Sequence, residues 1–183
     1  MRNYLVALVA LFFAFGVALS AAHAQTFEIG AKIGVWSGDD MDNAAPAGKD
    51  NDDYAFTYGL IGQYNIDENW SVRLDIELGT SDYVDTTCFV LSGVYNFPIE
   101  ESAFVPFVRA GVVIADVDID FTGAPDYDTE FGFELAVGVS YLVENWKIFA
   151  ELGYRDVSFD GTALVPDFDL PGFIFNIGVT FTF

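Results

Sequence analysis

The chain has 183 residues, a length typical of one domain or of one domain with a processed tail. Hydrophobic residues make up 52% of it, yet 28 acidic residues stand against 7 basic ones, for a formal net charge of -21. So few cations argue against nucleic-acid binding, because a phosphate backbone would not be neutralised. The apolar and aromatic content argues against an acidic disordered chain. The single cysteine excludes a disulfide framework and a cysteine-based zinc site.

Residues 1–24 are predicted to be a secretory signal peptide, cleaved after export through the Sec pathway. Arg2 supplies a positive charge, an apolar run extends over residues 5–19, and Ala22-His23-Ala24 is a cleavage motif. A transmembrane anchor is disfavoured, because the run is shorter than the ~20 residues that a spanning helix needs. The predicted mature domain, residues 25–183, contains no histidine, since His23 is the only one in the chain.

From Gln25 onward the hydrophobic pattern has a period of two. This period is typical of strands, because successive side chains point to opposite faces. The pattern is clearest at the end of the chain, where alternate residues from Phe173 to Phe183 are all apolar. The pattern predicts eight strands, over residues 27–36, 54–65, 70–79, 88–97, 104–115, 131–141, 146–155 and 173–183.

The connections between these strands differ in length. Residues 66–69, 98–103 and 142–145 form short links, residues 80–87 an intermediate one, and residues 37–53, 116–130 and 156–172 long ones. If the strands run up and down, the short links share one end of the sheet. This arrangement predicts an all-β fold, an eight-stranded antiparallel up-and-down transmembrane β-barrel with short periplasmic turns and longer extracellular loops.

A secreted soluble barrel is the alternative, and the two faces of the strands argue against it. One face has no charged residue on any predicted strand, as lipid requires, since Arg or Lys at mid-bilayer costs ~2–4 kcal/mol. Aromatic residues such as Trp70, Tyr141 and Trp146 flank the short links, as in an interfacial girdle. The other face carries balanced charges that fit a closed lumen only when paired: Glu28, Lys32, Arg73, Asp75, Glu77, Arg109, Glu134, Lys147, Glu151 and Arg155.

The signal peptide, the eight strands, the segment FGFELAVGVSYLVENWKIFAELGYR (residues 131–155) and the terminal strand ending at Phe183 resemble the small outer-membrane β-barrel family of the OmpA/OmpX type. The resemblance covers essentially all of the predicted mature chain. It implies localisation in the outer membrane of a Gram-negative bacterium. The partners it implies are outer-membrane lipid, periplasmic chaperones and the barrel-assembly machinery, with Phe181 and Phe183 in the assembly signal. OmpX-like proteins are the nearer comparison, since no peptidoglycan-binding domain is expected.

The lumen is predicted to be structural rather than catalytic. Without a histidine, the predicted mature chain lacks the Ser-His-acid and Asp-His mechanisms of outer-membrane enzymes, so no enzyme is expected. Asp75 and Glu77 lie two apart beside Arg73, which favours a salt-bridged interior. Eight strands enclose a lumen just wide enough for side chains, so a filled lumen is favoured over a conducting one. The charge network could also gate a small ion leak.

The long connections carry most of the acid and suggest a second kind of site. Asp116, Asp118 and Asp120 are spaced like the start of a calcium loop. The sixth position is Phe121 rather than glycine, however, and the twelfth is Tyr127 rather than glutamate, so no EF-hand is predicted. A solvated acidic surface is favoured. The alternative is loosely bound Ca²⁺ or Mg²⁺ at the acidic loops, and no other cofactor is expected.

Two functions remain open from the sequence. One is a structural, envelope or surface-interaction role of the adhesion type, with an extracellular partner. The other is a narrow porin-like conduit for small solutes or apolar compounds. The inward Phe107 and Phe149 would support a conduit only if they lined a continuous apolar passage, whereas paired charges at the same depth would argue against it.

Overall fold

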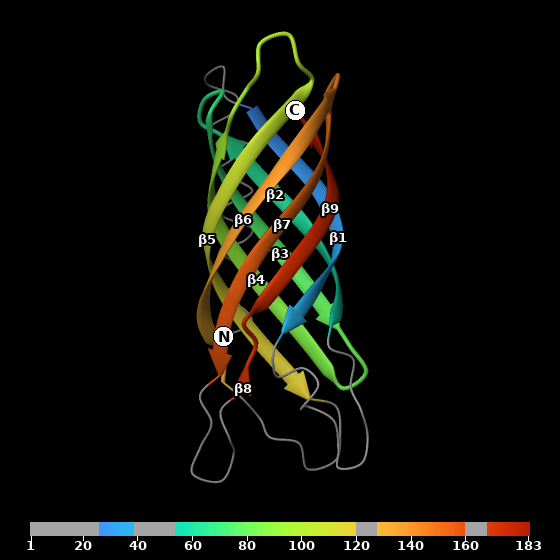
Figure 1. Cartoon of the computed structure of the whole chain (residues 1–183), viewed down its shortest axis with the longest axis vertical. Coiled ribbons are helices and arrows are strands. Elements are labelled where there is room, and N and C mark those ends of the chain that lie inside the picture. The colour runs from blue at the N-terminus through green and yellow to red at the C-terminus, as the bar shows by residue number, and fades with distance from the viewer. Residues whose placement is uncertain (1–25, 39–53, 120–127, 160–167) are drawn as a thin grey trace.

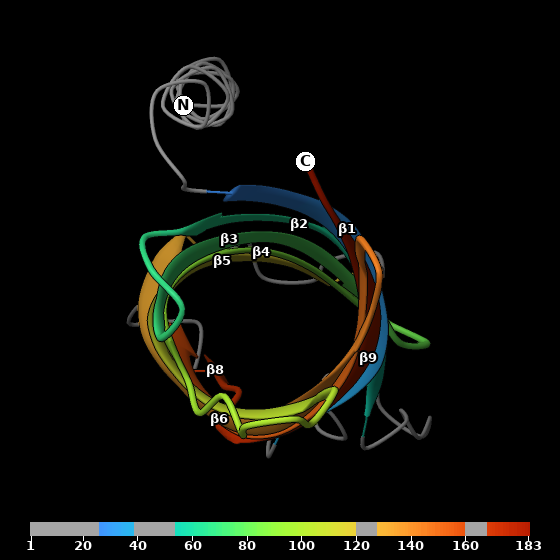
Figure 2. The ribbon, with the colours of Figure 1, turned by 90° about the horizontal axis from the view of Figure 1, so that it is seen from above.

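The computed structural model describes residues 26–38, 54–119, 128–159 and 168–183. They form a closed antiparallel barrel, with strands inclined to its axis in Figure 1 and a complete ring in Figure 2. Among these residues no helix is long and apolar enough to span a membrane. The strands are β1 (Thr26–Gly38), β2 (Ala55–Asn65), β3 (Trp70–Thr80), β4 (Val84–Asn96), β5 (Phe104–Ile119), β6 (Glu130–Val143), β7 (Trp146–Phe159), β8 (Phe168–Asp169) and β9 (Gly172–Thr182).

Eight long strands form the barrel wall, as the sequence predicts, and β8 is an extra two-residue strand beside β7. Each wall strand pairs with its neighbours in the chain, and β9 closes the ring between β7 and β1. Cross-strand partners followed once round the wall lead from Glu28 to Gly38, ten residues further along β1. This stagger is the reason why the strands tilt against the barrel axis.

The two ends of the barrel differ. At the turn end, residues 66–69, 97–103 and 144–145 join successive strands. Aromatic pairs lie beside these turns: Trp70 with Tyr95 and Trp146 with Phe181, both at 4.9 Å between ring centroids, and Phe104 with Tyr141 at 4.8 Å. This belt is the predicted girdle. The opposite end is here called the loop end. It is the end at which the described strands border residues 39–53, 120–127 and 160–167.

The strands extend further towards the loop end than the sequence pattern predicts. The expected link over residues 80–87 is wrong, because β4 begins at Val84 and only residues 81–83 lie between β3 and β4. Similarly, β5 continues to Ile119 and β7 to Phe159. The longer strands place Asp85, Asp116, Asp118 and Asp156 on the wall rather than in loops.

The outer wall is apolar and exposed, while the inward side chains are buried. Leu60, Val112 and Val137 on the outer wall are 60%, 56% and 58% exposed. The inward arginines Arg73 and Arg155 are 3% and 0% exposed. Across the apolar band of the wall, hydrophobic side chains therefore point outward and charged side chains inward, which is the reverse of a soluble barrel.

Candidate functional site: the filled lumen

An ion-pair layer occupies the middle of the lumen. Where one strand carries several members, they stand two or four residues apart and therefore share the inward face of the strand. Four cations face four carboxylates, and the charges cancel: Lys32, Arg73, Arg109 and Arg155 with Asp75, Glu77, Glu134 and Glu151. Because all eight side chains are buried, each charge depends on its partners for the stabilisation that water would otherwise supply.

The arginines join carboxylates from different strands. Arg155 binds Glu77 at 2.5 Å and Glu134 at 2.6 Å. Arg109 contacts Glu134, and its Nη2 lies 3.0 Å from Glu151. The planar guanidinium group suits such sites, because it presents several N–H donors in a fixed geometry. The network therefore ties β3, β5, β6 and β7 together across the lumen.

The remaining cations of the layer complete the connection. Arg73 binds Asp75 at 2.8 Å and Glu151 at 3.3 Å. Lys32 on β1 lies 3.3 Å from Asp75 and 2.9 Å from Glu77. Asp75 is thus shared by three cations from β1, β3 and β5, because Arg109 Nη1 also lies 3.5 Å from its Oδ2 atom. This sharing leaves neither carboxylate of the Asp75 and Glu77 pair available as an unpaired general base.

A separate ion pair lies nearer the turn end. Lys147 Nζ donates to Glu28 at 2.6 Å. Glu28 also accepts hydrogen bonds from Thr180 Oγ1 at 2.7 Å and Asn65 Nδ2 at 2.8 Å. The structure therefore places all ten charged residues of the predicted network in the lumen, eight in the central layer and two in this pair.

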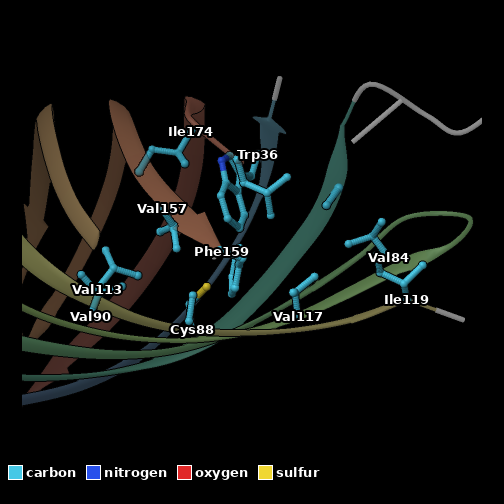
Figure 3. Close-up of a cluster of buried hydrophobic side chains, with 13 residues drawn as sticks. Trp36, Val84, Cys88, Val90, Val113, Val117, Ile119, Val157, Phe159 and Ile174 are labelled. Atoms are coloured by element: carbon cyan, nitrogen blue, oxygen red, sulfur yellow. The ribbon is translucent and has the colours of Figure 1, made fainter. Parts of the chain in front are cut away.

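An apolar cluster fills the loop end of the lumen, as Figure 3 shows. Trp36 connects the cluster with the ion-pair layer, because the guanidinium carbon of Arg155 lies 4.7 Å from the centroid of its ring. The buried thiol of Cys88 belongs to the same cluster, where it acts as a small packed side chain. The cluster is composed of Trp36, Ala55, Val84, Cys88, Val90, Val113, Ala115, Val117, Ile119, Val157, Phe159, Leu170 and Ile174.

Leu170 enters this cluster from the segment between β8 and β9. Its backbone N–H donates to Val157 O at 2.9 Å, and its side chain is fully buried. In Figure 2 β8 lies inside the ring of the wall strands. Residues 168–170 thus lie within the mouth of the barrel. The sequence pattern does not predict this segment, because a single inward leucine after a two-residue strand has no detectable period.

A second, smaller apolar cluster lies on the turn side of the lumen and contains Ile61, Val94, Phe107 and Phe149. The rings of Phe107 and Phe149 meet edge to face at 6.4 Å, and Arg73 stacks 4.8 Å above Phe149. A pocket of about 10 Å³ beside them has room for about one water molecule. The ion-pair layer separates this cluster from the one at the loop end. Phe107 and Phe149 therefore line no continuous apolar passage.

The candidate metal ligands lie outside the lumen. Asp116 and Asp118 are on the outer face of β5, and Asp120 falls outside the described residues. Asp116 accepts a hydrogen bond from Thr129 Oγ1 at 3.0 Å. In the described part of the chain, no three His, Cys, Asp or Glu side chains are grouped to hold a metal ion. The prediction that Asp116 and Asp118 begin a loop is wrong, because Val117 and Ile119 continue the buried inward alternation of β5.

An apolar outer wall, an aromatic girdle and a charged, side-chain-filled interior define a transmembrane β-barrel of the bacterial outer-membrane class. The comparison with protein families agrees with this class. The chain belongs to the outer membrane protein beta-barrel domain family, whose model matches residues 6–183. The predicted fold and family resemblance are both confirmed, and the family implies the outer membrane of a Gram-negative bacterium. No curated protein matches the chain.

Solved structures share the fold at low sequence identity. The outer membrane protein OprG from Pseudomonas aeruginosa is 18% identical, with a TM-score of 0.63, covering 86% of this chain and 95% of its own. The N-terminal β-barrel domain of OprF from the same species is 17% identical, with a TM-score of 0.62 and coverage of 86% and 97%. Ail, the attachment invasion locus protein of Yersinia pestis, is 15% identical, with a TM-score of 0.51 and coverage of 87% and 97%.

Proposed function

We propose that this protein is a non-enzymatic outer-membrane barrel with a non-conducting lumen, serving a structural or surface-interaction role. The proposal rests on the order in which layers of packed side chains follow one another along the lumen. An apolar cluster at the loop end is followed by a neutral ion-pair layer. On the turn side come the smaller apolar cluster that contains Phe107 and Phe149, and the Lys147–Glu28 ion pair. An ion entering from either end would have to displace packed side chains and separate buried ion pairs, each a costly step.

The absence of unpaired catalytic groups in the described lumen supports a non-enzymatic role. A general base must be free to accept a proton and must lie within reach of a substrate. Asp75 and Glu77 are instead held by Lys32, Arg73 and Arg155, and the side chains are 0% and 2% exposed. Residues 25–183 also contain no histidine. Paired and inaccessible carboxylates stabilise a structure rather than perform acid–base chemistry.

The charge at the loop end supports a surface-interaction role. Short turns of outer-membrane barrels face the periplasm, and the longer loops face the outside. Asp85, Asp116, Asp118 and Asp156 stand on the outer wall at the loop end, whereas all five Lys and Arg side chains in the described part of the chain point into the lumen. This surface favours a partner with cationic groups. Ail, which shares the fold, is named for attachment and invasion.

Conductance across a planar lipid bilayer tests the closed lumen. Purified, refolded protein is expected to give no stable current steps, because the three layers leave no continuous aqueous path. An outer-membrane porin inserted under the same conditions serves as the positive control, and a gel shift on heating verifies that the test protein is folded. Uniform current steps that persist after repurification would overturn the closed-lumen proposal and favour a solute conduit.

A loop-replacement strain tests the surface role. Replacing residues 39–53 with a short Gly-Ser linker removes six aspartates and leaves β1 and β2 intact. The barrel is expected to assemble normally, while attachment to a cationic surface or to neighbouring cells falls. The matched control replaces only the six aspartates with asparagine. Unchanged attachment in both variants, with altered solute uptake, would contradict the surface role.

We propose that the acidic loop end is a solvated surface rather than a metal centre. Like charges that remain hydrated keep such surfaces soluble and apart. Calorimetric titration with Ca²⁺ and then Mg²⁺ is expected to give no binding heat at millimolar ion. Saturable heat that disappears in an Asp116→Asn, Asp118→Asn double variant would instead establish loosely bound divalent cations there.

A further inference from the structure

A groove of about 450 Å³ crosses the outer wall on the turn side. Its base is formed where Gly93 of β4 and Ala110 of β5 stand opposite each other in the ladder. Larger side chains form its rims, among them Trp70, Tyr95, Leu135 and Leu152. A Cβ atom at Gly93 would meet no described residue within 4 Å, its chain neighbours aside. The groove is therefore a depression one side chain deep in an otherwise continuous apolar wall.

The position of the groove decides what can occupy it. It is continuous with the lipid-facing wall, and its lining is apolar apart from Arg109, whose side chain is buried in the lumen. It also begins beside Trp70 and Tyr95, whose rings belong to the girdle at the periplasmic turn end. Its volume lies within the ~300–1,000 Å³ typical of small-molecule sites. An apolar groove that opens at a membrane interface fits an acyl chain that enters from the headgroup region.

We propose that this groove binds one acyl chain of a phospholipid from the periplasmic leaflet, so that the lipid is held longer than its neighbours in the bilayer. The site is independent of the filled lumen and of the role proposed for the loop end. Binding gains free energy because the chain packs against a concave wall, where it makes more van der Waals contacts than against a convex one.

The turns next to the groove select the headgroup. Glu68 precedes Trp70 by two residues and is exposed, and the exposed Glu100 and Glu101 lie in the neighbouring turn. Asp67 is held by the backbone N–H groups of Asn69 and Trp70 at 2.8 and 2.7 Å. No Lys or Arg occurs in residues 66–69 or 97–103. This acidic border favours a zwitterionic headgroup with an ammonium, such as ethanolamine, and disfavours an anionic headgroup such as glycerol phosphate.

Two tryptophans provide a matched test. Trp70 borders the groove, whereas Trp146 lies in the girdle away from it; each is 51% exposed, and each has an aromatic partner at 4.9 Å. The W146F variant retains Trp70, and the W70F variant retains Trp146, with the buried Trp36 as a common background. Both variants are reconstituted in vesicles that contain increasing mole fractions of phosphatidylethanolamine brominated on its acyl chains, which quenches tryptophan fluorescence on contact.

Trp70 is expected to be quenched at a lower mole fraction of brominated lipid than Trp146, by about threefold, or about 0.7 kcal/mol. Brominated phosphatidylglycerol should show a smaller preference. Gly93→Leu, made in the W146F background, fills the groove and should shift the Trp70 curve to that of Trp146; Ala110→Leu is the second variant should Gly93→Leu fail to fold. Equal quenching of Trp70 and Trp146, or a Trp70 preference unchanged by both leucine variants, would overturn the proposal. Protein-concentration-dependent protection of Trp70 from quenching would overturn it in favour of a second copy of the chain in the groove.

Discussion

Phe107 and Gly138 face each other as direct cross-strand partners of β5 and β6, and the phenyl ring occupies the space that a side chain at position 138 would fill. A Cβ atom at Gly138 would overlap the Cζ atom of Phe107. The same relationship recurs on β7 and β9, where Phe149 faces Gly178. These two glycines are required because the narrow lumen has room for one large side chain at each pair, not two.

Replacing Gly138 with alanine is therefore expected to lower the free energy of unfolding by about 1–3 kcal/mol, since overpacking forces the Phe107 ring from its position. Urea unfolding in lipid vesicles, followed by tryptophan fluorescence, measures the change. Gly93→Ala is the matched control: it also replaces a strand glycine, but its Cβ points into open space. We expect Gly93→Ala to be neutral or stabilising by up to about 1 kcal/mol. Equal destabilisation by both variants would show that steric overlap in the lumen is not the cause.

The Glu134→Gln variant tests the ion-pair layer. Arg155 donates to Glu134 Oε2 through Nε at 2.7 Å, and Arg109 contacts the other carboxylate oxygen. Removal of this charge leaves two buried guanidinium groups with one fewer counter-charge, a change that costs about 3–5 kcal/mol. Urea unfolding of folded protein measures the loss.

Lys147→Met provides the comparison for the ion-pair prediction. Lys147 is 15% exposed, and Glu28 retains its hydrogen bonds from Thr180 and Asn65 when the lysine is removed. Its unfolding free energy should therefore fall by less than that of Glu134→Gln. A loss for Glu134→Gln no greater than that for Lys147→Met would mean that water reaches the central layer and screens its charges.

The two faces of the strands could be predicted from sequence, but the partners of the charges could not. A period of two places Glu134 and Arg155 inward without reference to any other strand. Which charges meet depends on the stagger of the barrel, and a shift of register would pair them differently. Arg155 thus contacts Glu77 as well as Glu134, although these glutamates lie on β3 and β6.

The loop ends of the strands were harder to predict for a different reason. On β5 the inward residues near the loop end are Val117 and Ile119, and the outward ones are Asp116 and Asp118. Beyond the apolar band of the membrane the usual polarity of the two faces is reversed, so a rule that identifies the apolar face as outward ends the strand too early. The same reversal occurs on β7, where Asp156 points outward and Phe159 inward.

Cys88 reports whether the loop end of the lumen is closed. Its thiol is buried in the apolar cluster, and its sulfur accepts a hydrogen bond from Arg155 Nη1 at 3.6 Å. In folded protein a membrane-impermeant maleimide should react with Cys88 at least about tenfold more slowly than with a Thr80→Cys, Cys88→Ala variant, because the reagent needs an accessible thiolate. Mass spectrometry after timed quenching measures both rates. Fast labelling of wild-type Cys88 would indicate a lumen open to water.

Leu170→Ala tests the short segment that lies within the barrel mouth. Loss of the buried leucine side chain is expected to cost about 2–5 kcal/mol, because a cavity is left in the cluster. It should also increase the rate at which Cys88 reacts with maleimide, since both residues belong to the same cluster. Unchanged labelling and unchanged stability together would mean that Leu170 is not what closes the mouth.

Phe183→Ala separates assembly from stability. Phe183 is 68% exposed, its ring lies 5.1 Å from that of Phe181, and its backbone N–H donates to Phe27 O. Because Phe183 and Phe173 are comparably exposed on the outer wall, where lipid surrounds them, the purified Phe183→Ala variant should refold with a loss of unfolding free energy similar to that of Phe173→Ala. The yield of folded Phe183→Ala protein in cells should nevertheless fall if the barrel-assembly machinery recognises the terminal aromatic residue. Phe173→Ala is the matched control, since Phe173 is 64% exposed at the other end of β9. Equal yields for the two variants would show that the side chain of Phe183 carries no assembly signal.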